Sequence, residues 1–329
     1  MRFKGFYWAA TAEHHAEDWA ALQHSGANSV VIPRHAVTTD LLAALREQGM
    51  LAYVDLALFA GSDLRLRFPT SAPIDEAGAI MGADGWYVPA CPNHPALRAQ
   101  HLADLQQLLL HTSDMLAGVW LDFIRYPMRW EVAQPRLMQA CFCDRCLSLF
   151  HAAEERSYSA ADRRHATRAI LAEQANTWTA WKCHRIADYV KQIAALVRQY
   201  PHLRLGLFAL PWRLSDHQGG IRTIVGQDLA LLGQIVDTIS PMVYHRLCYR
   251  DPSWIAAVIH EARARSHAPI LPVVQSLDQP HPLADTELAQ AIAIAAAAAH
   301  QDTIIFDLRS VARDTAKLAA VRNMLAQIG

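Results

Sequence analysis

The chain alternates eight times between a short apolar run and a segment with helical periodicity. Each apolar run has the length and composition of a β-strand that is buried on both faces, and a helix candidate follows each one. We expect strands at 3–8, 28–33, 51–58, 118–125, 203–210, 238–244, 269–275 and 303–308. The expected helices cover 15–25, 39–48, 95–111, 146–199, 228–235, 253–265, 285–299 and 314–328.

Eight such units in 329 residues predict an α/β fold of the (β/α)8 or TIM-barrel type, with one domain over residues 1–329. The alternative is a doubly wound open sheet, which usually has a glycine-rich turn after its first strand, where this chain has Trp8-Ala9-Ala10-Thr11. Two long connections, 59–94 and 127–145, follow the third and fourth strands. They leave the C-terminal ends of these strands, where barrel enzymes place their active sites.

Charge and motifs argue against several classes of function. Thirty basic and 31 acidic residues leave a net charge of −1, which provides no field for binding nucleic acid or an anionic membrane. The sequence has no Walker-type phosphate loop, no Gly-x-Ser-x-Gly elbow and no His-Glu-x-x-His motif. The N-terminus runs into strand-like sequence without the apolar segment of a signal peptide, and the longest apolar run, 289–299, is too short to span a bilayer. We therefore expect a cytoplasmic protein.

Four cysteines have the spacing of metal ligands. Cys141, Cys143 and Cys146 form a Cys-x-Cys-x-x-Cys cluster before a helix, and Cys91 lies in the preceding long connection. Three thiolates converge in such a cluster, and a fourth would complete the tetrahedral shell of a structural zinc. The alternative is a set of ordinary reduced cysteines, and His94 is a possible substitute ligand.

Asp122 is the only carboxylate in the apolar fourth strand and its extension, residues 118–127. A buried ionised group costs several kcal/mol unless it is paired, so its presence there suggests a function. The alternative is an aspartate that orients the loop by hydrogen bonds with Arg125. If the chemistry needs a second carboxylate, the candidates are Asp307, which ranks first, Asp55 and Glu131.

Two sets of residues resemble known glycosidase barrels. Residues 91–98 (CPNHPALR), the acid on the fourth strand and the Cys-x-Cys-x-x-Cys cluster resemble the zinc-binding arrangement of glycoside hydrolase family 42 β-galactosidases. Residues 121–127 (LDFIRYP) and 239–244 (ISPMVY) resemble segments of glycoside-hydrolase-like family 10 proteins. The resemblance implies a barrel, a zinc site and an acid at the fourth strand.

The chain departs from family 42 at both catalytic positions. That family carries an Asn-Glu pair at the fourth strand and a glutamate at the seventh, whereas this chain has Leu121-Asp122 and Val274-Gln275. The resemblance therefore does not transfer a mechanism with two glutamates, nor specificity for galactosides.

Side chains at the other strand ends are candidates for sugar binding, because aromatic faces and polar groups together suit a sugar ring. For each aromatic, packing of the barrel mouth is the alternative. The candidates are Trp8, Arg34, Asp55, Arg125, Tyr126, Trp212, Tyr244, His245 and Gln275.

These observations predict a glycoside hydrolase that cleaves an oligo- or polysaccharide, with Asp122 as the acid, Asp307 as its partner and a structural zinc. The carbohydrate is the only partner expected, and the oligomeric state is left open. A second hypothesis is a carbohydrate-binding barrel that has lost catalysis. An aldolase or lyase ranks below both, because no lysine lies at the C-terminal end of an expected strand.

Overall fold

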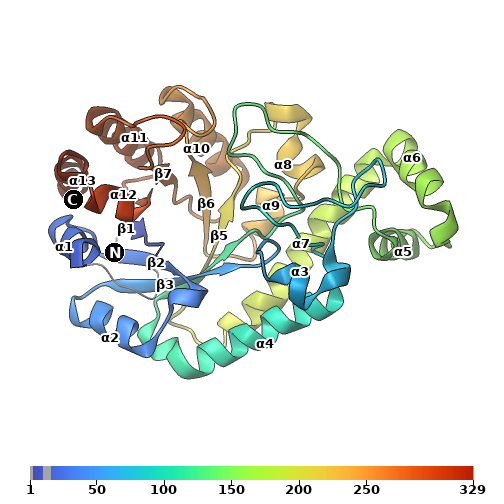
Figure 1. Cartoon of the computed structure of the whole chain (residues 1–329), viewed down its shortest axis with the longest axis horizontal. Coiled ribbons are helices and arrows are strands. Elements are labelled where there is room, and N and C mark those ends of the chain that lie inside the picture. Colours follow the sequence, from blue (N-terminus) through green and yellow to red (C-terminus); the bar gives the residue numbers. More distant parts are fainter. Residues whose placement is uncertain (1–2, 10–15, 329) are drawn as a thin grey trace.

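Eight parallel strands close into a barrel in the computed structural model, which describes residues 3–9 and 16–328 (Figure 1). Each strand pairs with the next one along the chain, and β8 pairs with β1. The predicted (β/α)8 fold is confirmed. Ala10 and Thr11 of the first connection lie outside the described residues. The strands are β1 (Lys4–Tyr7), β2 (Ser29–Pro33), β3 (Leu51–Ala57), β4 (Gly118–Asp122), β5 (Arg204–Ala209), β6 (Thr238–Val243), β7 (Val273–Gln275) and β8 (Thr303–Phe306).

Helices surround the strands, and α5 and α6 lie at the side of the molecule away from both termini (Figure 1). None of the helices in the described part of the chain is long and apolar enough to cross a membrane. The helices are α1 (Ala16–His24), α2 (Thr39–Glu47), α3 (Leu64–Arg67), α4 (Pro95–Thr112), α5 (Asp144–Ala153), α6 (Arg163–Glu173), α7 (Ala175–Val197), α8 (Gly220–Thr223), α9 (Leu229–Leu232), α10 (Ser253–Arg265), α11 (Asp285–Ala298), α12 (Leu308–Ala312) and α13 (Thr315–Gln327).

The prediction of one helix over 146–199 is wrong, because this region forms α5, α6 and α7. The chain leaves the helical conformation after Ala153, where Glu155 has a positive φ of 54°. It leaves it again at Gln174, where φ is −128°. The predicted seventh strand is also shorter than expected, since Pro272 lacks the N–H that a central strand would use.

Large aromatic side chains fill the barrel interior near the N-terminal ends of the strands. The rings of Tyr53 and Trp120 lie 4.9 Å apart, and the Trp120 indole Nε1–H donates to Ser240 Oγ across the barrel at 2.9 Å. Gly206, the neighbour of Trp120 in the β4–β5 register, leaves the room for this ring. A Cβ at position 206 would lie 2.2 Å from the indole.

Candidate active site at the barrel mouth

Asp122 is the last residue of β4, so its carboxylate lies at the C-terminal mouth of the barrel. The carboxylate is half-buried, and its Oδ1 accepts a hydrogen bond from the Phe123 N–H at 2.6 Å. Burial raises the pKa of Asp122 to about 6, although the nearby Arg125 guanidinium acts in the opposite direction. Such a group is partly protonated near neutral pH, as a general acid must be.

Asp55 lies one layer deeper in the barrel, on β3. Its Oδ2 accepts from the Tyr7 hydroxyl at 2.8 Å, and its Oδ1 has no hydrogen-bond partner among the described residues. Burial, and then the charge of Asp122, raise the pKa of Asp55 well above its ordinary value. We therefore expect Asp55 to keep its proton while Asp122 ionises.

Glu131 is the third carboxylate of this group and comes from the loop after β4. It is half-buried, and its Oε2 has no hydrogen-bond partner in the described chain. Burial raises the pKa of Glu131, whereas the Arg125 charge lowers it. The Arg125 Nη1 donates to the Met128 carbonyl at 2.5 Å, which fixes the guanidinium near both Asp122 and Glu131.

Stacked aromatic rings line the same end of the barrel. The Tyr244 ring lies between those of Trp130 and Phe306, with centroid separations of 5.5 and 5.1 Å. Phe306 also contacts Tyr7 at 5.1 Å. Burial raises the pKa of Tyr244, and the charges of Asp122, Glu131 and Asp55 raise it further, so this phenol stays protonated among the carboxyls. The arrangement offers proton donors beside apolar ring faces.

Asp307 follows β8, and its charge also raises the pKa of Tyr244, after those of Asp122, Glu131 and Asp55. Its Oδ1 accepts from the Ser310 N–H at 3.0 Å and so caps the N-terminus of α12. Burial raises the pKa of Asp307, and the Ser310 N–H and the Arg309 charge act in the opposite direction. The catalytic role of Asp307 stays a prediction, while the structure brings Asp55 and Glu131 together with Asp122.

Three further predicted residues form no hydrogen bond or ion pair with Asp122, Asp55 or Glu131 in the described part of the chain. Trp8 is fully buried, and its indole N–H donates to Asp18 Oδ2 at 3.0 Å. Arg34 is exposed on a short turn after β2. Tyr126 is buried, and its hydroxyl accepts from Asn93 Nδ2 at 2.9 Å. Each of the two buried side chains has a structural contact that explains its position.

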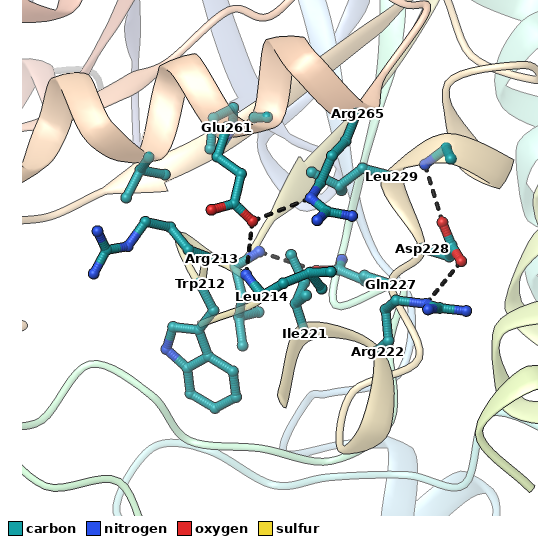
Figure 2. A pocket seen from close by; sticks show the side chains of 15 residues that line it. Trp212, Arg213, Leu214, Ile221, Arg222, Gln227, Asp228, Leu229, Glu261 and Arg265 are labelled. Atoms are coloured by element: carbon teal, nitrogen blue, oxygen red, sulfur yellow. Dashed lines mark hydrogen bonds and ion pairs between the residues drawn. The ribbon is translucent and has the colours of Figure 1, made fainter. Parts of the chain in front are cut away.

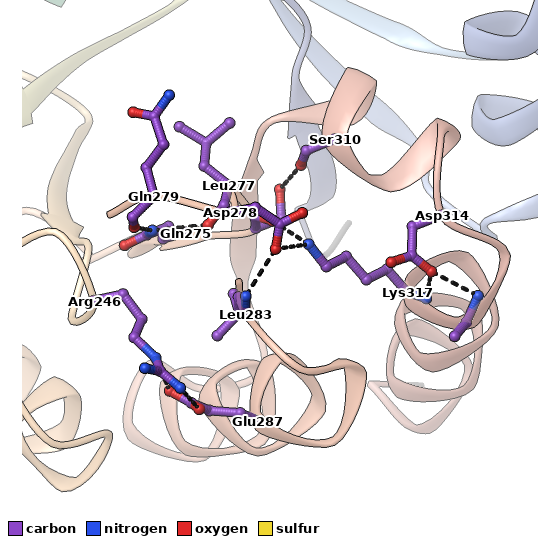
Figure 3. Close-up of polar contacts among 12 residues, drawn as sticks. Arg246, Gln275, Leu277, Asp278, Gln279, Leu283, Glu287, Ser310, Asp314 and Lys317 are labelled. Atoms are coloured by element: carbon purple, nitrogen blue, oxygen red, sulfur yellow. Dashed lines mark hydrogen bonds and ion pairs between the residues drawn. The ribbon is translucent and has the colours of Figure 1, made fainter. Parts of the chain in front are cut away.

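The seventh-strand glutamine fastens a loop. Gln275 accepts from the Leu247 N–H at 3.0 Å. It also donates to the carbonyls of Leu277 and Gln279, at 2.9 and 2.6 Å (Figure 3). The same loop is held by an ion pair of 2.7 Å between Asp278 and the buried Lys317. Both the oxygen and the nitrogen of the Gln275 side-chain amide are therefore hydrogen-bonded within the protein.

His245 and Trp212 lie at the edge of the mouth. The His245 Nε2 is 2.9 Å from a Glu287 carboxylate oxygen, and Glu287 also pairs with Arg246. Trp212 lines a small cavity of about 20 Å³ between the loop after β5 and α10 (Figure 2). This cavity contains none of the three carboxylates, so it is not the candidate reaction centre.

The four predicted metal ligands converge. The sulfur atoms of Cys91, Cys141, Cys143 and Cys146 all lie within 4.8 Å of one another and are buried. Cys91 Sγ lies 3.8 Å from that of Cys143 and 3.5 Å from that of Cys146. A tetrahedral site with zinc–sulfur bonds of about 2.3 Å has sulfur–sulfur edges of about 3.8 Å, so the spacing fits zinc.

His94 does not belong to this group of ligands. Its Nδ1 accepts from the Leu97 N–H at 3.2 Å and caps α4, and its Nε2 contacts Thr70 Oγ1 at 3.0 Å. Two N–H groups instead point at the sulfurs: Asn93 Nδ2 donates to Cys146 at 3.3 Å and the Ile74 N–H to Cys141 at 3.4 Å. Such donors stabilise thiolates.

Sequence reasoning missed the aromatic neighbours of the acid. Trp130 and Phe306 were not singled out, although they directly precede Glu131 and Asp307 in the chain. The position next to a candidate carboxylate at a strand end is the signal that could have found them.

No protein-family model matches the chain, and no curated protein matches it. Solved structures do match. The β-galactosidase of the Antarctic haloarchaeon Halorubrum lacusprofundi has a TM-score of 0.72 at 14% identity, and the match covers 100% of this chain and 58% of that one. The glycoside hydrolase domain of PgaB (BpsB) from Bordetella bronchiseptica has a TM-score of 0.71 at 11% identity, with 94% and 92% covered.

A third match is Gan42B, a GH42 β-galactosidase from G. stearothermophilus, with a TM-score of 0.69 at 11% identity and 98% and 56% covered. The chain thus spans little more than half the length of these two β-galactosidases, and nearly all of the PgaB domain. At such identities the matches establish the fold. The chain is a (β/α)8 barrel similar in structure to glycoside hydrolases.

Proposed function

We propose that the protein is a glycoside hydrolase that cleaves an oligo- or polysaccharide, with Asp122 as the proton donor. The observation that supports this proposal is a carboxyl at the C-terminal end of β4 whose pKa is raised to about 6 by burial. The fold shared with glycoside hydrolases and the resemblance of residues 121–127 to glycoside-hydrolase-like family 10 agree with it.

We assign the second carboxylate to Glu131. Glycoside hydrolysis uses one carboxyl to protonate the leaving oxygen and another to attack the sugar or activate water. Glu131 is half-buried and has a free Oε2, whereas Asp55 is only 3% exposed and is bound by Tyr7. Asp55 therefore acts as a buried, protonated neighbour below Asp122 and not as the second carboxylate.

The test compares Asp122→Asn and Glu131→Gln with the parent on a panel of oligosaccharides. Each variant should lower kcat/KM by at least about a hundred-fold, the usual contribution of a general acid or base. Parent activity should fall above about pH 6, because the donor then loses its proton. Full activity of Asp122→Asn on a substrate that the parent cleaves would refute the assignment.

Asp307→Asn separates the two candidate partners. Asparagine also caps a helix, so this variant keeps the contact with Ser310 and should keep its activity if Glu131 is the partner. If Asp307→Asn lost activity and Glu131→Gln kept it, Asp307 would be the second carboxylate. Binding of saccharides by the parent without any cleavage would instead favour a carbohydrate-binding barrel.

We also propose that the four cysteines bind a structural zinc, as the resemblance to family 42 implies. The buried sulfurs with near-tetrahedral spacing and the two N–H donors support this site. Four protein ligands leave no open position, so the metal would stabilise the loops and would not activate water. A cytoplasmic location, also a proposal, fits clustered thiols that bind metal rather than form disulfides.

A further inference from the structure

Three aromatic side chains form a wall that runs from the protein surface to the candidate acid. We call Trp86, Tyr87 and Phe123 the aromatic wall. Their ring centroids lie 5.8 Å (Trp86–Tyr87), 6.1 Å (Trp86–Phe123) and 5.9 Å (Tyr87–Phe123) apart. Trp86 is 59% exposed, Phe123 is half-buried and Tyr87 is buried. Phe123 directly follows Asp122 and donates its N–H to Asp122 Oδ1 at 2.6 Å, so the inner end of the wall is joined to the candidate acid through the backbone.

The backbone at Phe123 is strained. Its φ is 50°, a left-handed conformation that bulky residues rarely adopt and that costs about 1–3 kcal/mol. In this conformation its N–H reaches Asp122 Oδ1 at 2.6 Å while its ring contacts Trp86 and Tyr87. One backbone conformation therefore sets both the orientation of the acid and the inner end of the wall.

The exposed end of the wall is carried by a turn whose backbone is hydrogen-bonded. Trp86 lies in a tight turn closed by two backbone hydrogen bonds between Asp84 and Tyr87, of 2.9 and 3.1 Å, and Gly85 supplies the positive φ of 59° that the turn needs. Arg129 pairs with Asp84 at 2.6 Å and so ties this turn to the loop after β4. Because the turn backbone is already ordered and the indole packs against Tyr87 and Phe123, stacking of a ligand on Trp86 costs less entropy than it would on a free loop.

The wall is also joined to the carboxylates electrostatically. The Arg125 guanidinium lies 5.6 Å from the Tyr87 centroid and 5.3 Å from that of Phe123. The same guanidinium lowers the pKa of Asp122 and of Glu131. The Tyr87 hydroxyl accepts from the Met128 N–H at 3.1 Å, so the middle of the wall is anchored to the same loop.

We infer that the aromatic wall is a sugar-binding platform that leads from solvent to Asp122, and that the substrate is therefore a chain of several sugars rather than a short glycoside. The inference rests on the proposed function. Pyranose rings have flat C–H faces that pack on aromatic rings, and their hydroxyls stay in water at an exposed indole. A ring on Trp86 would belong to the same chain as the ring beside Asp122.

The test measures binding to an array of neutral and amino oligosaccharides from disaccharides to octasaccharides. Every protein variant in this test, including the reference protein, also carries Asp122→Asn to prevent turnover. Adding Trp86→Ala should weaken binding of tetrasaccharides and longer chains about ten-fold, through the loss of the buried apolar contact. Disaccharides should be affected much less. Trp86→Phe keeps an aromatic face and should restore most of the affinity.

Tyr249→Ala is the matched control, because Tyr249 is 56% exposed on another loop at the same end of the barrel. It should leave binding unchanged. The platform assignment would be wrong if Trp86→Ala and the reference protein, both carrying Asp122→Asn, bound tetrasaccharides and longer glycans equally. It would also be wrong if neither protein bound any of these glycans. Cleavage by the otherwise unmodified chain is assayed separately: cleavage without dependence on Trp86 refutes only the platform, and Trp86-dependent binding without cleavage refutes only the hydrolase.

Discussion

Asp122 ionises where water reaches it only in part, and this has a cost for folding. Its pKa is raised to about 6 in the folded chain from an ordinary value of 3.8, so the folded state holds this proton more tightly than the unfolded state. The contribution of Asp122 to stability is therefore most favourable below about pH 4, falls as the pH rises to about 6, and stays lowered above that. A candidate catalytic group is here a source of instability at neutral pH.

Asp122→Asn should consequently stabilise the fold while it abolishes activity. Asparagine keeps an acceptor for the Phe123 N–H but carries no charge. We expect a gain on the order of 1–2 kcal/mol in the free energy of unfolding at pH 7.5, and little difference at pH 4. Urea unfolding at the two pH values measures it.

The exposed Asp114 provides the control for this measurement. Asp114→Asn should change the free energy of unfolding by less than about 0.5 kcal/mol, because it is a surface substitution at a side chain that is open to water. If Asp122→Asn were less stable than the parent at pH 7.5, the carboxylate would be stabilised in its ionised form, and the inferred electrostatics of the mouth would be wrong.

The sequence identified Asp122 but could not choose its partner. A single carboxylate in an apolar strand stands out because burial of charge is costly, and that argument needs no tertiary structure. Asp307 met the same criterion, yet its carboxylate caps α12, which depends on the backbone after β8. Glu131 comes from a loop whose path the sequence does not define, so only the structure places it beside Asp122.

At the scale of elements, one glycine on β5 decides how the barrel interior is filled. The Trp120 indole is held by Ser240 and Tyr53 and occupies the space beside Gly206. Because a Cβ there would meet the indole at 2.2 Å, Gly206→Ala forces a shift of the ring or of a strand. We expect a loss of about 1–3 kcal/mol in the free energy of unfolding, measured in urea.

Gly82→Ala is the matched comparison, because a Cβ at Gly82 meets no atom within 4 Å and its φ is not positive. It should change stability by less than about 0.5 kcal/mol. If Gly206→Ala were equally neutral, the interior would have room that the structure does not show.

The strands were predictable and the long helical region was not, for a physical reason. Strands buried on both faces form short apolar runs with turn residues between them, and this pattern survives without tertiary context. The breaks between α5, α6 and α7 contain neither proline nor glycine, so helical periodicity runs across them. The turn at Glu155 takes its positive φ without a residue type that signals one.

At the scale of the whole molecule, the cysteine cluster joins the long loops to the strand that carries the acid. Cys91 comes from the loop after β3, and the other three cysteines lie at the start of α5 and just before it. Asn93 donates both to Cys146 and to the hydroxyl of Tyr126. Tyr126 lies four residues after Asp122 in the chain. Loss of a metal at this cluster should therefore disturb the mouth of the barrel without touching the carboxylates.

Elemental analysis of the purified protein should find one zinc per molecule. Removal by a strong chelator should lower Tm by about 5 °C or more, since a structural zinc contributes several kcal/mol to folding, and 1 kcal/mol moves Tm by about 2–4 °C in a domain of 150–250 residues and by less in a longer chain. Cleavage activity should be lost as the metal-free protein unfolds, and it should return when zinc is added. Cys143→Ser should lose the metal, whereas Cys183→Ala, at a buried cysteine outside the cluster, should keep it. A metal-free chain with the Tm of the purified protein would show that the four thiols need no ion to hold these loops.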